Sequence, residues 1–380
     1  MSAQPIGYFV HHQGRGHAER ATALCNMLVQ SRPVEIFTAR PDIFRGLDPA
    51  IGVTQIPSLF EPTGGEPPNM RSLPEPATTH CAPLGWPSIR DAMATLTGWF
   101  SAANPAVFVT DVSAELGQLA RLCSVPHVAV LQHGRRGDIG HMAAYESAIG
   151  IIAPYARLLE QDDRPAWMQA KTHYAPGLGV DVPALPSRDD ARRALGLPLD
   201  DRIVCVIGGG GGEGLPSTPL TLGARQDPHA RWFTLGKITS EWHETAPGNL
   251  THLGWVNNAA QWIAAADRIV SSCGNTTVHT VLAARKPWIV VPEWRYFDEQ
   301  LCKAQALEAA GLAAMSPHWP SHREAWEALW AISDGIDLSS QAQFIDAAAA
   351  QDTAAWLDKL ATELWADTPA TQATNMKAVA

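Results

Sequence analysis

The sequence has few charged residues and nothing that directs it to nucleic acid or through a membrane. Of its 380 residues 17% are charged, and 38 acidic against 28 basic residues give a formal net charge of −10. Nucleic-acid binding needs clustered Lys and Arg, so this balance argues against a nucleic-acid partner. No apolar run reaches the roughly 20 residues of a membrane-spanning helix, and the N-terminus lacks the basic and apolar regions of a secretory signal. We therefore expect a cytoplasmic protein without a transmembrane segment.

The sequence also lacks the patterns of common disulfide and metal sites. Its six cysteines are scattered, with no Cys-x-x-Cys pair and no regular spacing. Four of them sit in apolar strand-like or helix-like runs, which indicates reduced cysteines packed in cores. The distribution suggests neither a disulfide framework nor a zinc site. No Asp-x-Asp pair is present either. We expect neither a metal ion nor a cofactor.

The apolar content and the length favour two domains. Hydrophobic residues make up 46% of the chain, and 380 residues exceed what one core usually supports. Short apolar runs alternate with helical stretches in two series, which is typical of parallel α/β sheets. The first series has strand-like runs at 6–10, 34–37, 107–110 and 127–131. The second has such runs at 203–207, 232–235, 250–253, 268–271 and 288–291.

A stretch rich in proline and glycine separates the two series. We expect an N-terminal domain over residues 1–175, a linker over 176–186 and a C-terminal domain over 187–341. Residues 342–366 should form a C-terminal helix that packs back on the N-terminal domain, followed by a tail over 367–380. Residues 61–87, rich in Pro, Gly and Thr, interrupt the first series and should form a long surface excursion.

The first candidate for chemistry is the segment 11–17, His-His-Gln-Gly-Arg-Gly-His, between the first strand-like run and a helix. A histidine at a helix N-terminus gains little structurally, because the helix dipole disfavours its protonated form. The same effect keeps the imidazole neutral, as a general base requires. His17 is therefore the candidate base. Further candidates in the loops beside it are Gly14, Arg15, Gly16 and His133.

Three segments of the second series are candidates for binding a ligand. Residues 208–212 are five consecutive glycines, and ordering them is costly in entropy, which favours a close approach to a ligand over a simple hinge. Residues 271–277 supply hydroxyls and amides at a helix start, suited to an anion or to ordinary N-capping. Residues 292–300 end in Glu299 and Gln300, which suit sugar hydroxyls or helix capping.

In order and spacing these segments resemble the GT-B glycosyltransferases, in particular the MurG-like and UDP-glycosyltransferase-like superfamily. The specific part of the resemblance lies within residues 254–311, and it includes Gly-Trp-Val at 254–256, Cys-Gly-Asn-Thr-Thr at 273–277 and Ala-Ala-Gly at 309–311. The resemblance implies two Rossmann-like, doubly wound parallel-sheet domains that face a cleft. It also implies an acceptor in the N-terminal domain and a nucleotide sugar in the C-terminal one.

The resemblance assigns a role to each matching residue. His17 matches the catalytic base, and Asp111, at the end of a strand, matches the acid that orients it. For the donor nucleotide the resemblance implies Gly209, Gly210, Trp255, Val256, Gly274, Asn275, Thr276 and Thr277, and for the donor sugar Glu299 and Gln300. Relatives usually carry a ribose-binding glutamate where this chain has Thr280. The motif therefore does not fix the nucleotide, and UDP is the favoured one.

The resemblance thus implies an inverting, metal-independent glycosyltransferase that moves a sugar from a nucleotide sugar to an acceptor hydroxyl. Two alternatives stay open. A nucleotide-sugar hydrolase or epimerase could use the same fold, with His17 activating water in the hydrolase. A non-catalytic nucleotide-sugar-binding protein would need no base, and the presence of His17 and Asp111 argues against it. The sequence discloses neither the sugar, the acceptor nor the oligomeric state.

Overall fold

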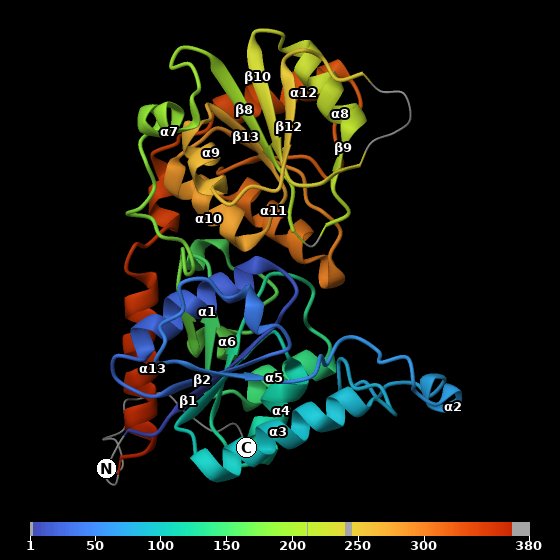
Figure 1. Ribbon diagram of the computed structural model, residues 1–380, viewed down its shortest axis with the longest axis vertical. Coiled ribbons are helices and arrows are strands. Elements are labelled where there is room, and N and C mark those ends of the chain that lie inside the picture. The colour runs from blue at the N-terminus through green and yellow to red at the C-terminus, as the bar shows by residue number, and fades with distance from the viewer. Residues whose placement is uncertain (1–2, 211, 240–244, 367–380) are drawn as a thin grey trace.

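The protein, described here by a computed structural model, consists of two parallel α/β domains stacked one above the other (Figure 1). The structure describes residues 3–210, 212–239 and 245–366. Gly211 of the glycine run and the expected tail 367–380 lie outside the described residues. The prediction of two Rossmann-like parallel-sheet domains is confirmed.

The N-terminal domain is built on seven parallel strands in the order β3-β2-β1-β4-β5-β6-β7. They are β1 (Ile6–Val10), β2 (Val34–Thr38), β3 (Gly52–Gln55), β4 (Val107–Asp111), β5 (His127–Val130), β6 (Gly150–Ala153) and β7 (Thr172–Tyr174). The order reverses between β1 and β4, which pair in register from Ile6 opposite Val107 to Val10 opposite Asp111. Every residue of these two strands is buried, as expected for central strands covered by helices on both faces.

The C-terminal domain repeats this plan with six parallel strands in the order β12-β10-β8-β13-β14-β15. They are β8 (Arg202–Ile207), β10 (Ala230–Leu235), β12 (Leu250–Gly254), β13 (Arg268–Ser271), β14 (Trp288–Val290) and β15 (Ala314–Met315). The order reverses between β8 and β13. A separate two-stranded sheet pairs β9 (Leu215–Pro216) with β11 (Ile238–Thr239).

Helices cover both sheets. In the N-terminal domain they are α1 (Arg15–Leu28), η1 (Pro41–Ile43), α2 (Pro68–Arg71), α3 (Pro87–Ala103), α4 (Ala114–Leu122), α5 (Ile139–Ser147), η2 (Arg157–Leu159) and α6 (Ala166–Ala170). The later ones are α7 (Arg188–Leu195), α8 (Ser217–Gln226), α9 (Ala259–Ala265), α10 (Asn275–Ala284), η3 (Tyr296–Asp298), α11 (Glu299–Ala309), α12 (Arg323–Asp334), η4 (Ser340–Phe344) and α13 (Ala349–Leu364). None of the helices in the described ranges is long and apolar enough to cross a membrane.

The structure shifts several expected boundaries. Helix α1 begins at Arg15, since Gly14 makes the turn at φ 92°, so the second half of the segment 11–17 is already helical. Helix α10 likewise begins at Asn275, inside the segment 271–277. The C-terminal helix begins at Ala349 and not at 342, because the backbone N–H of Asp346 bonds to Pro176 O and its carboxylate accepts from Ala348 N. The short strands β3, β6, β7 and β15 gave too little periodicity to be predicted.

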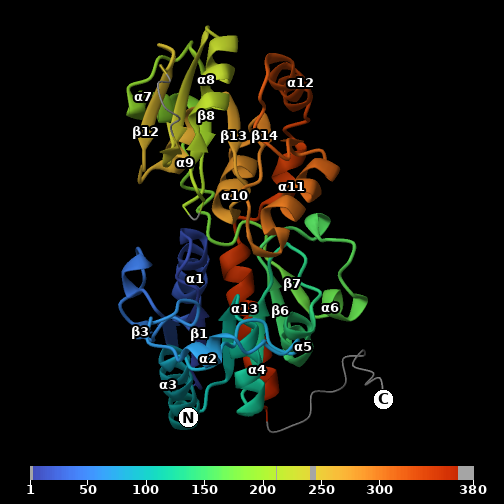
Figure 2. The same ribbon diagram turned by 90° about the vertical axis from the view of Figure 1, so that its right-hand side faces the viewer.

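The last helix joins the two domains. It leaves the C-terminal domain and runs along the N-terminal one beside α1 (Figures 1 and 2). Its buried face adds Ala354, Leu357 and Ala361 to the N-terminal core. Arg32 Nε donates to Asp358 Oδ1 at 2.5 Å on the same contact. The N-terminal core therefore includes α13, the last helix of the described residues.

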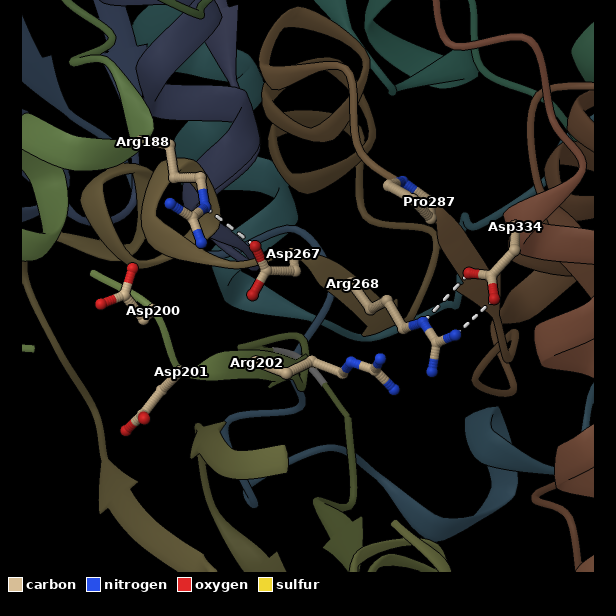
Figure 3. Close-up of a pocket in the computed structure, with 8 residues that line it drawn as sticks. All are labelled: Arg188, Asp200, Asp201, Arg202, Asp267, Arg268, Pro287 and Asp334. Carbon is tan, nitrogen blue, oxygen red and sulfur yellow. Dashed lines mark hydrogen bonds and ion pairs between the residues drawn. The ribbon is translucent and has the colours of Figure 1, made fainter. Parts of the chain in front are cut away.

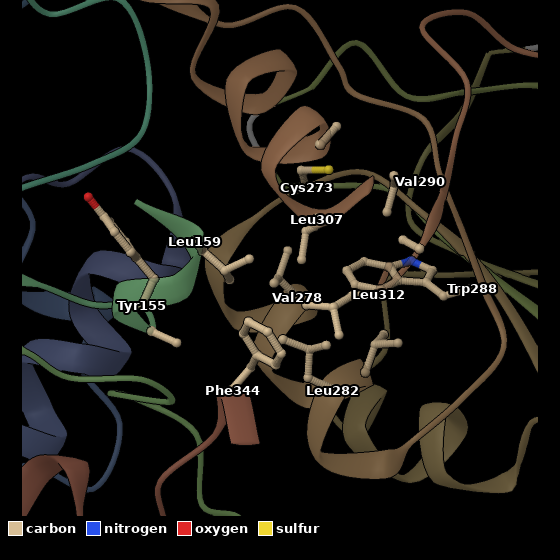
Figure 4. Close-up of a cluster of buried hydrophobic side chains, with 14 of the residues drawn as sticks. Tyr155, Leu159, Cys273, Val278, Leu282, Trp288, Val290, Leu307, Leu312 and Phe344 are labelled. Atoms are coloured by element: carbon tan, nitrogen blue, oxygen red, sulfur yellow. The ribbon is translucent and has the colours of Figure 1, made fainter. Parts of the chain in front are cut away.

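A second apolar contact crosses the boundary between the domains. Tyr155 and Leu159 of the N-terminal domain belong to one buried cluster with Val278, Leu282 and Phe344 (Figure 4). Because burial of such side chains is the main driving force of folding, this cluster fixes how the two sheets face each other.

Leu357→Ala should lower the free energy of unfolding by about 2–5 kcal/mol, since Leu357 is fully buried between α13 and the N-terminal sheet. Urea unfolding followed by circular dichroism measures the change. The matched control is Leu364→Ala on the same helix, whose side chain is 44% exposed and which should change stability little. Equal effects of the two substitutions would show that α13 contributes no core.

Candidate active site

The sequence motifs lie at the carboxyl ends of the four strands where the strand order reverses. Residues 11–17 follow β1, Asp111 ends β4, residues 208–212 follow β8 and residues 272–277 follow β13. Ligands of doubly wound sheets bind at these positions. The motifs of the N-terminal domain meet those of the C-terminal domain at the domain boundary, where Thr276 Oγ1 donates to Glu19 Oε2 at 2.6 Å.

His17 and Asp111 are in contact, as the register of β1 and β4 requires. His17 Nδ1 lies 3.0 Å from Asp111 Oδ1. The carboxylate is fully buried, whereas the His17 side chain is 14% exposed. We assign the ring hydrogen to Nδ1, because an ionised carboxylate can only accept. Nε2 is then left free to accept a proton.

Arg20 completes this cluster and was not predicted. Its Nε donates to Asp111 Oδ2 at 2.7 Å and its Nη2 to Oδ1. Nη2 also lies 2.6 Å from His17 Nδ1, but with the ring hydrogen on Nδ1 both nitrogens are donors, so they make no hydrogen bond to each other and share the same carboxylate. Burial alone would raise the pKa of Asp111, but the charge of Arg20 and the hydrogen bonds from Arg20 and His17 hold it below its ordinary value. A signal for Arg20 existed: it lies four and eight positions before Leu24 and Leu28, on the apolar stripe of α1.

Two other histidines of the loop, His11 and His12, lie beside this cluster. The His11 ring lies 5.3 Å from the His17 ring and stacks on Phe60 at 4.3 Å. Burial and the neighbouring His17 lower the pKa of His11 to about 3. His12 Nε2 lies 3.3 Å from Glu61 Oε1, at the root of the excursion. His11 therefore stays neutral beside His17 near pH 7.

Helix α11 holds the turn after β13 through Gln300 and Lys303. Gln300 Oε1 accepts from the backbone N–H of Cys273 and of Glu293, both at 2.9 Å. Lys303 Nζ donates to Cys273 O at 3.2 Å and to Asn275 Oδ1. Burial lowers the pKa of Lys303, and the Glu299 carboxylate opposes the shift. Both polar groups of the Cys273 backbone are thus fixed from one helix.

Glu299 lies between a cation of each domain. Its carboxylate is 3.7 Å from Lys303 Nζ and 3.7 Å from Arg136 Nη2 of the N-terminal domain. Its neighbour Gln300 is 3% exposed, and in the described ranges no partner is found for its Nε2. The expected sugar-binding pair therefore sits at the domain boundary, with Gln300 also holding backbone.

The candidate nucleotide residues surround the same turn. Gly209 N donates to Glu293 Oε1 at 3.2 Å, and a Cβ on Gly210 would lie 3.7 Å from the Trp255 ring, which is 63% exposed. Gly274 caps α10 without a side-chain hydrogen bond, and Thr276 and Thr277 lie in the first turn. Val256 is half-buried and packs at the edge of the core. An exposed indole, a glycine turn and a helix start thus lie near one another.

Two residues that the sequence singled out, Thr280 and His133, make contacts within the protein. Thr280 Oγ1 donates to Thr276 O at 2.7 Å, so the hydroxyl that replaces the expected glutamate bonds within its own helix. His133 is fully buried, its ring lies 4.1 Å from the Tyr155 ring in a tilted arrangement, and its Nε2 lies 2.8 Å from Leu159 O. Burial keeps its pKa well below the ordinary range. The structure places His133 in the core beneath the boundary, while Arg15 is exposed and Gly16 lies against Thr276.

Two further observations concern the ionisable side chains outside the candidate site. Among residues 3–210, 212–239 and 245–366, no group of three or more His, Cys, Asp or Glu side chains is arranged to hold a metal ion. A surface pocket at the amino ends of β8 and β13 is lined by charged side chains (Figure 3). There Arg188 Nε donates to Asp267 Oδ1 at 2.8 Å and Arg268 Nε to Asp334 Oδ1 at 3.0 Å. This pocket therefore lies at the amino ends of the C-terminal strands, whereas the candidate site residues follow the carboxyl ends of the strands.

Comparison with known proteins agrees with this geometry. A glycotransferase of kitacinnamycin superimposes with a TM-score of 0.66 at 15% identity, covering 94% of this chain and 99% of that one. MurG of Acinetobacter baumannii superimposes with a TM-score of 0.58 at 15% identity, again covering 94% of this chain and 99% of that one. The chain has the GT-B fold. These two structural matches confirm the fold that the motifs indicated.

Sequence comparison gives a narrower match to the same GT-B group. No family model matches the chain. A relative from Symbiobacterium thermophilum, the UDP-N-acetylglucosamine–N-acetylmuramyl-(pentapeptide) pyrophosphoryl-undecaprenol N-acetylglucosamine transferase, is 27% identical over 213 residues. The match covers 51% of this chain and 53% of the relative, so the chain spans about half the length of that protein.

Asp111→Asn should lower the free energy of unfolding by about 3–5 kcal/mol, because it leaves the buried guanidinium of Arg20 without a carboxylate. The double variant Arg20→Met with Asp111→Asn removes both charges and should recover most of that loss. Asp358→Asn is the matched control, since it breaks an Arg–Asp pair whose carboxylate is 38% exposed. Urea unfolding near neutral pH measures all three.

The same pair predicts a pH dependence of stability. The pKa of Asp111 lies below its ordinary value of 3.8 in the folded protein, so its stabilising contribution is present above about pH 4 and is lost as the pH falls. The unfolding free energy of the wild type should therefore drop more steeply on acidification than that of the double variant. Parallel pH profiles for the two proteins would contradict a buried Arg20–Asp111 ion pair.

Proposed function

We propose that this protein is an inverting glycosyltransferase that moves a sugar from a nucleotide-sugar donor, UDP-sugar favoured, to an acceptor hydroxyl. The observation that carries the proposal is the proximity of a His–Asp pair to the start of α10. His17 lies two residues before Glu19, which binds Thr276 across the boundary, and Gly16 packs against the same Thr276. A base from one domain and an anion-binding helix start from the other thus lie next to each other.

In this proposal His17 Nε2 removes the proton of the acceptor hydroxyl as the oxygen attacks the anomeric carbon. A hydroxyl is a poor nucleophile near pH 7, so a positioned base lowers the barrier. Asp111 keeps the ring in the tautomer that leaves Nε2 free, and it stabilises the imidazolium that forms. Arg20 in turn holds Asp111 ionised and oriented. The attack from the face opposite the leaving group inverts the anomeric centre.

The C-terminal domain would bind the donor. The diphosphate would lie against the backbone N–H groups of Gly209 and Gly210 and of the α10 start, Gly274, Asn275, Thr276 and Thr277. The exposed Trp255 ring and Val256 suit the nucleobase. Glu299 and Gln300 Nε2 suit the sugar hydroxyls. The leaving diphosphate is stabilised by N–H groups and the helix dipole, and no metal ion or cofactor takes part.

The proposal is tested by incubating the protein with UDP-sugars and a panel of acceptors, with water as the only acceptor in a parallel reaction. Transfer predicts a glycosylated product of inverted anomeric configuration, resolved by NMR of the product. Release of free sugar at the same rate in water alone would identify a hydrolase. A product of retained configuration would exclude the inverting mechanism.

His17→Ala should reduce turnover by about 10²–10⁴-fold, because the acceptor hydroxyl loses its base, and should leave UDP affinity within about twofold. Initial rates and calorimetry with UDP measure the two effects. The matched control is His229→Ala, an exposed histidine just before β10 at the amino edge of the C-terminal sheet. Wild-type turnover in His17→Ala would assign the base to another residue.

A further inference from the structure

The loop before α11 contains two consecutive residues in a conformation that their side chains disfavour. Phe297 has φ 61° and ψ 23°, and Asp298 has φ 53° and ψ 31°. Only glycine adopts this left-handed region freely, and a bulky residue there is a true outlier. Such backbone persists only where the surrounding structure holds it, and it clusters at ligand sites. The contacts that hold this loop are therefore informative.

Those contacts come from the other domain. Phe297 O accepts a hydrogen bond from Arg135 N at 2.7 Å, and Arg135 Nε lies 3.2 Å from Asp298 Oδ2. Both of these contacts are made by Arg135, which lies in the loop after β5 of the N-terminal domain. A Cβ on Gly134, which has φ 120°, would lie 2.8 Å from Phe297 O, so glycine is needed for this close approach. Backbone of one domain is thus paired with strained backbone of the other.

The Phe297 ring occupies a site made of N-terminal side chains. The Arg136 guanidinium lies 5.0 Å from the ring centroid, in the range of a cation–π contact. The rings of His80 and His141 lie 4.8 and 4.9 Å away, both edge-on. His80 belongs to the excursion 61–87 and His141 to α5. We call these three residues with Gly134 the Phe297 seat.

The strained loop leads directly into the residues that shape the candidate donor site. Gln300, two residues after Asp298, binds the backbone N–H of Cys273 and Glu293. Glu293 in turn accepts from Gly209 N at 3.2 Å. Displacement of Phe297 would therefore move the first turn of α11 and, through Gln300, both turns that are suited to the diphosphate.

We propose that Phe297 is a positioning residue for the donor, and that the N-terminal domain holds the donor site in its binding geometry through the Phe297 seat. The inference rests on the proposed function, because it takes the turns at Gly209 and at 274–277 to hold the nucleotide. Coupling between two sites is reciprocal. A nucleoside diphosphate bound to the C-terminal turns should therefore also stabilise the contact between Phe297 and the seat.

The experiment uses the full chain and UDP as the probe. Hydrogen exchange read by mass spectrometry on peptides covering residues 133–138 reports the Arg135 N–H that bonds to Phe297 O. In the wild type UDP should slow exchange there. In Phe297→Ala the UDP dissociation constant should rise about tenfold, of the order of the strain released, and UDP should no longer slow exchange at 133–138.

Two further variants make the result specific. Tyr296→Ala is the matched control, because its ring is next in the loop, is 73% exposed and packs on Trp294. It should bind UDP and show exchange protection like the wild type. Phe297→Leu keeps an apolar side chain and should fold even where Phe297→Ala is unstable. It loses the ring face under Arg136, and its UDP affinity should fall about threefold.

The outcomes separate the two proposals. UDP binding of wild-type strength in Phe297→Ala and Phe297→Leu, or UDP-dependent protection of 133–138 in either at the wild-type level, would overturn the positioning role while leaving the glycosyltransferase proposal intact. If the wild type binds neither UDP nor another nucleoside diphosphate, the proposed function fails, and this inference fails with it.

Discussion

The ion pair between Arg20 and Asp111 is the interaction on which the candidate site depends. Both groups are buried, and each would be costly to bury alone, so neither can be removed without the other. The pair joins α1 to the end of β4, and it fixes the carboxylate that contacts His17. The orientation of the imidazole is therefore determined by the packing of the N-terminal domain and needs no ligand.

Sequence reasoning located the site because parallel strands end at one edge. A motif that directly follows a central strand must lie at that edge, so His17 and the turn at 274–277 could be placed without coordinates. The pairing of His17 with Asp111 came from the resemblance to the GT-B glycosyltransferases. Arg20, Lys303 and the contacts of Gln300 were missed, because these side chains project from the helices α1 and α11 onto other elements, which motifs at strand ends do not reveal. The Phe297 seat was beyond sequence reasoning, because three separate loops and helices build it. The burial of His133 was also beyond sequence reasoning, because a polar residue in a loop after a strand can turn inward as well as toward a ligand.

The two domains are less separate than their sheets suggest. Tyr155 and Leu159 share an apolar cluster with C-terminal residues, and the loop after β5 contacts the loop before α11. The turns that we propose to bind the nucleotide can thus be sensitive to substitutions in the N-terminal domain. Arg136 illustrates this, because it contacts Phe297 and lies near Glu299 while it belongs to the N-terminal domain.

The position of α13 has a consequence for synthesis. Ala354, Leu357 and Ala361 complete the core around α1, although more than 300 residues separate them from that helix. Domains generally fold from the N-terminus as the chain emerges, but here the first domain exposes the apolar flank of α1 until α13 has left the ribosome. The nascent N-terminal domain is therefore unfinished for most of translation, and it becomes complete only after the C-terminal domain has been made.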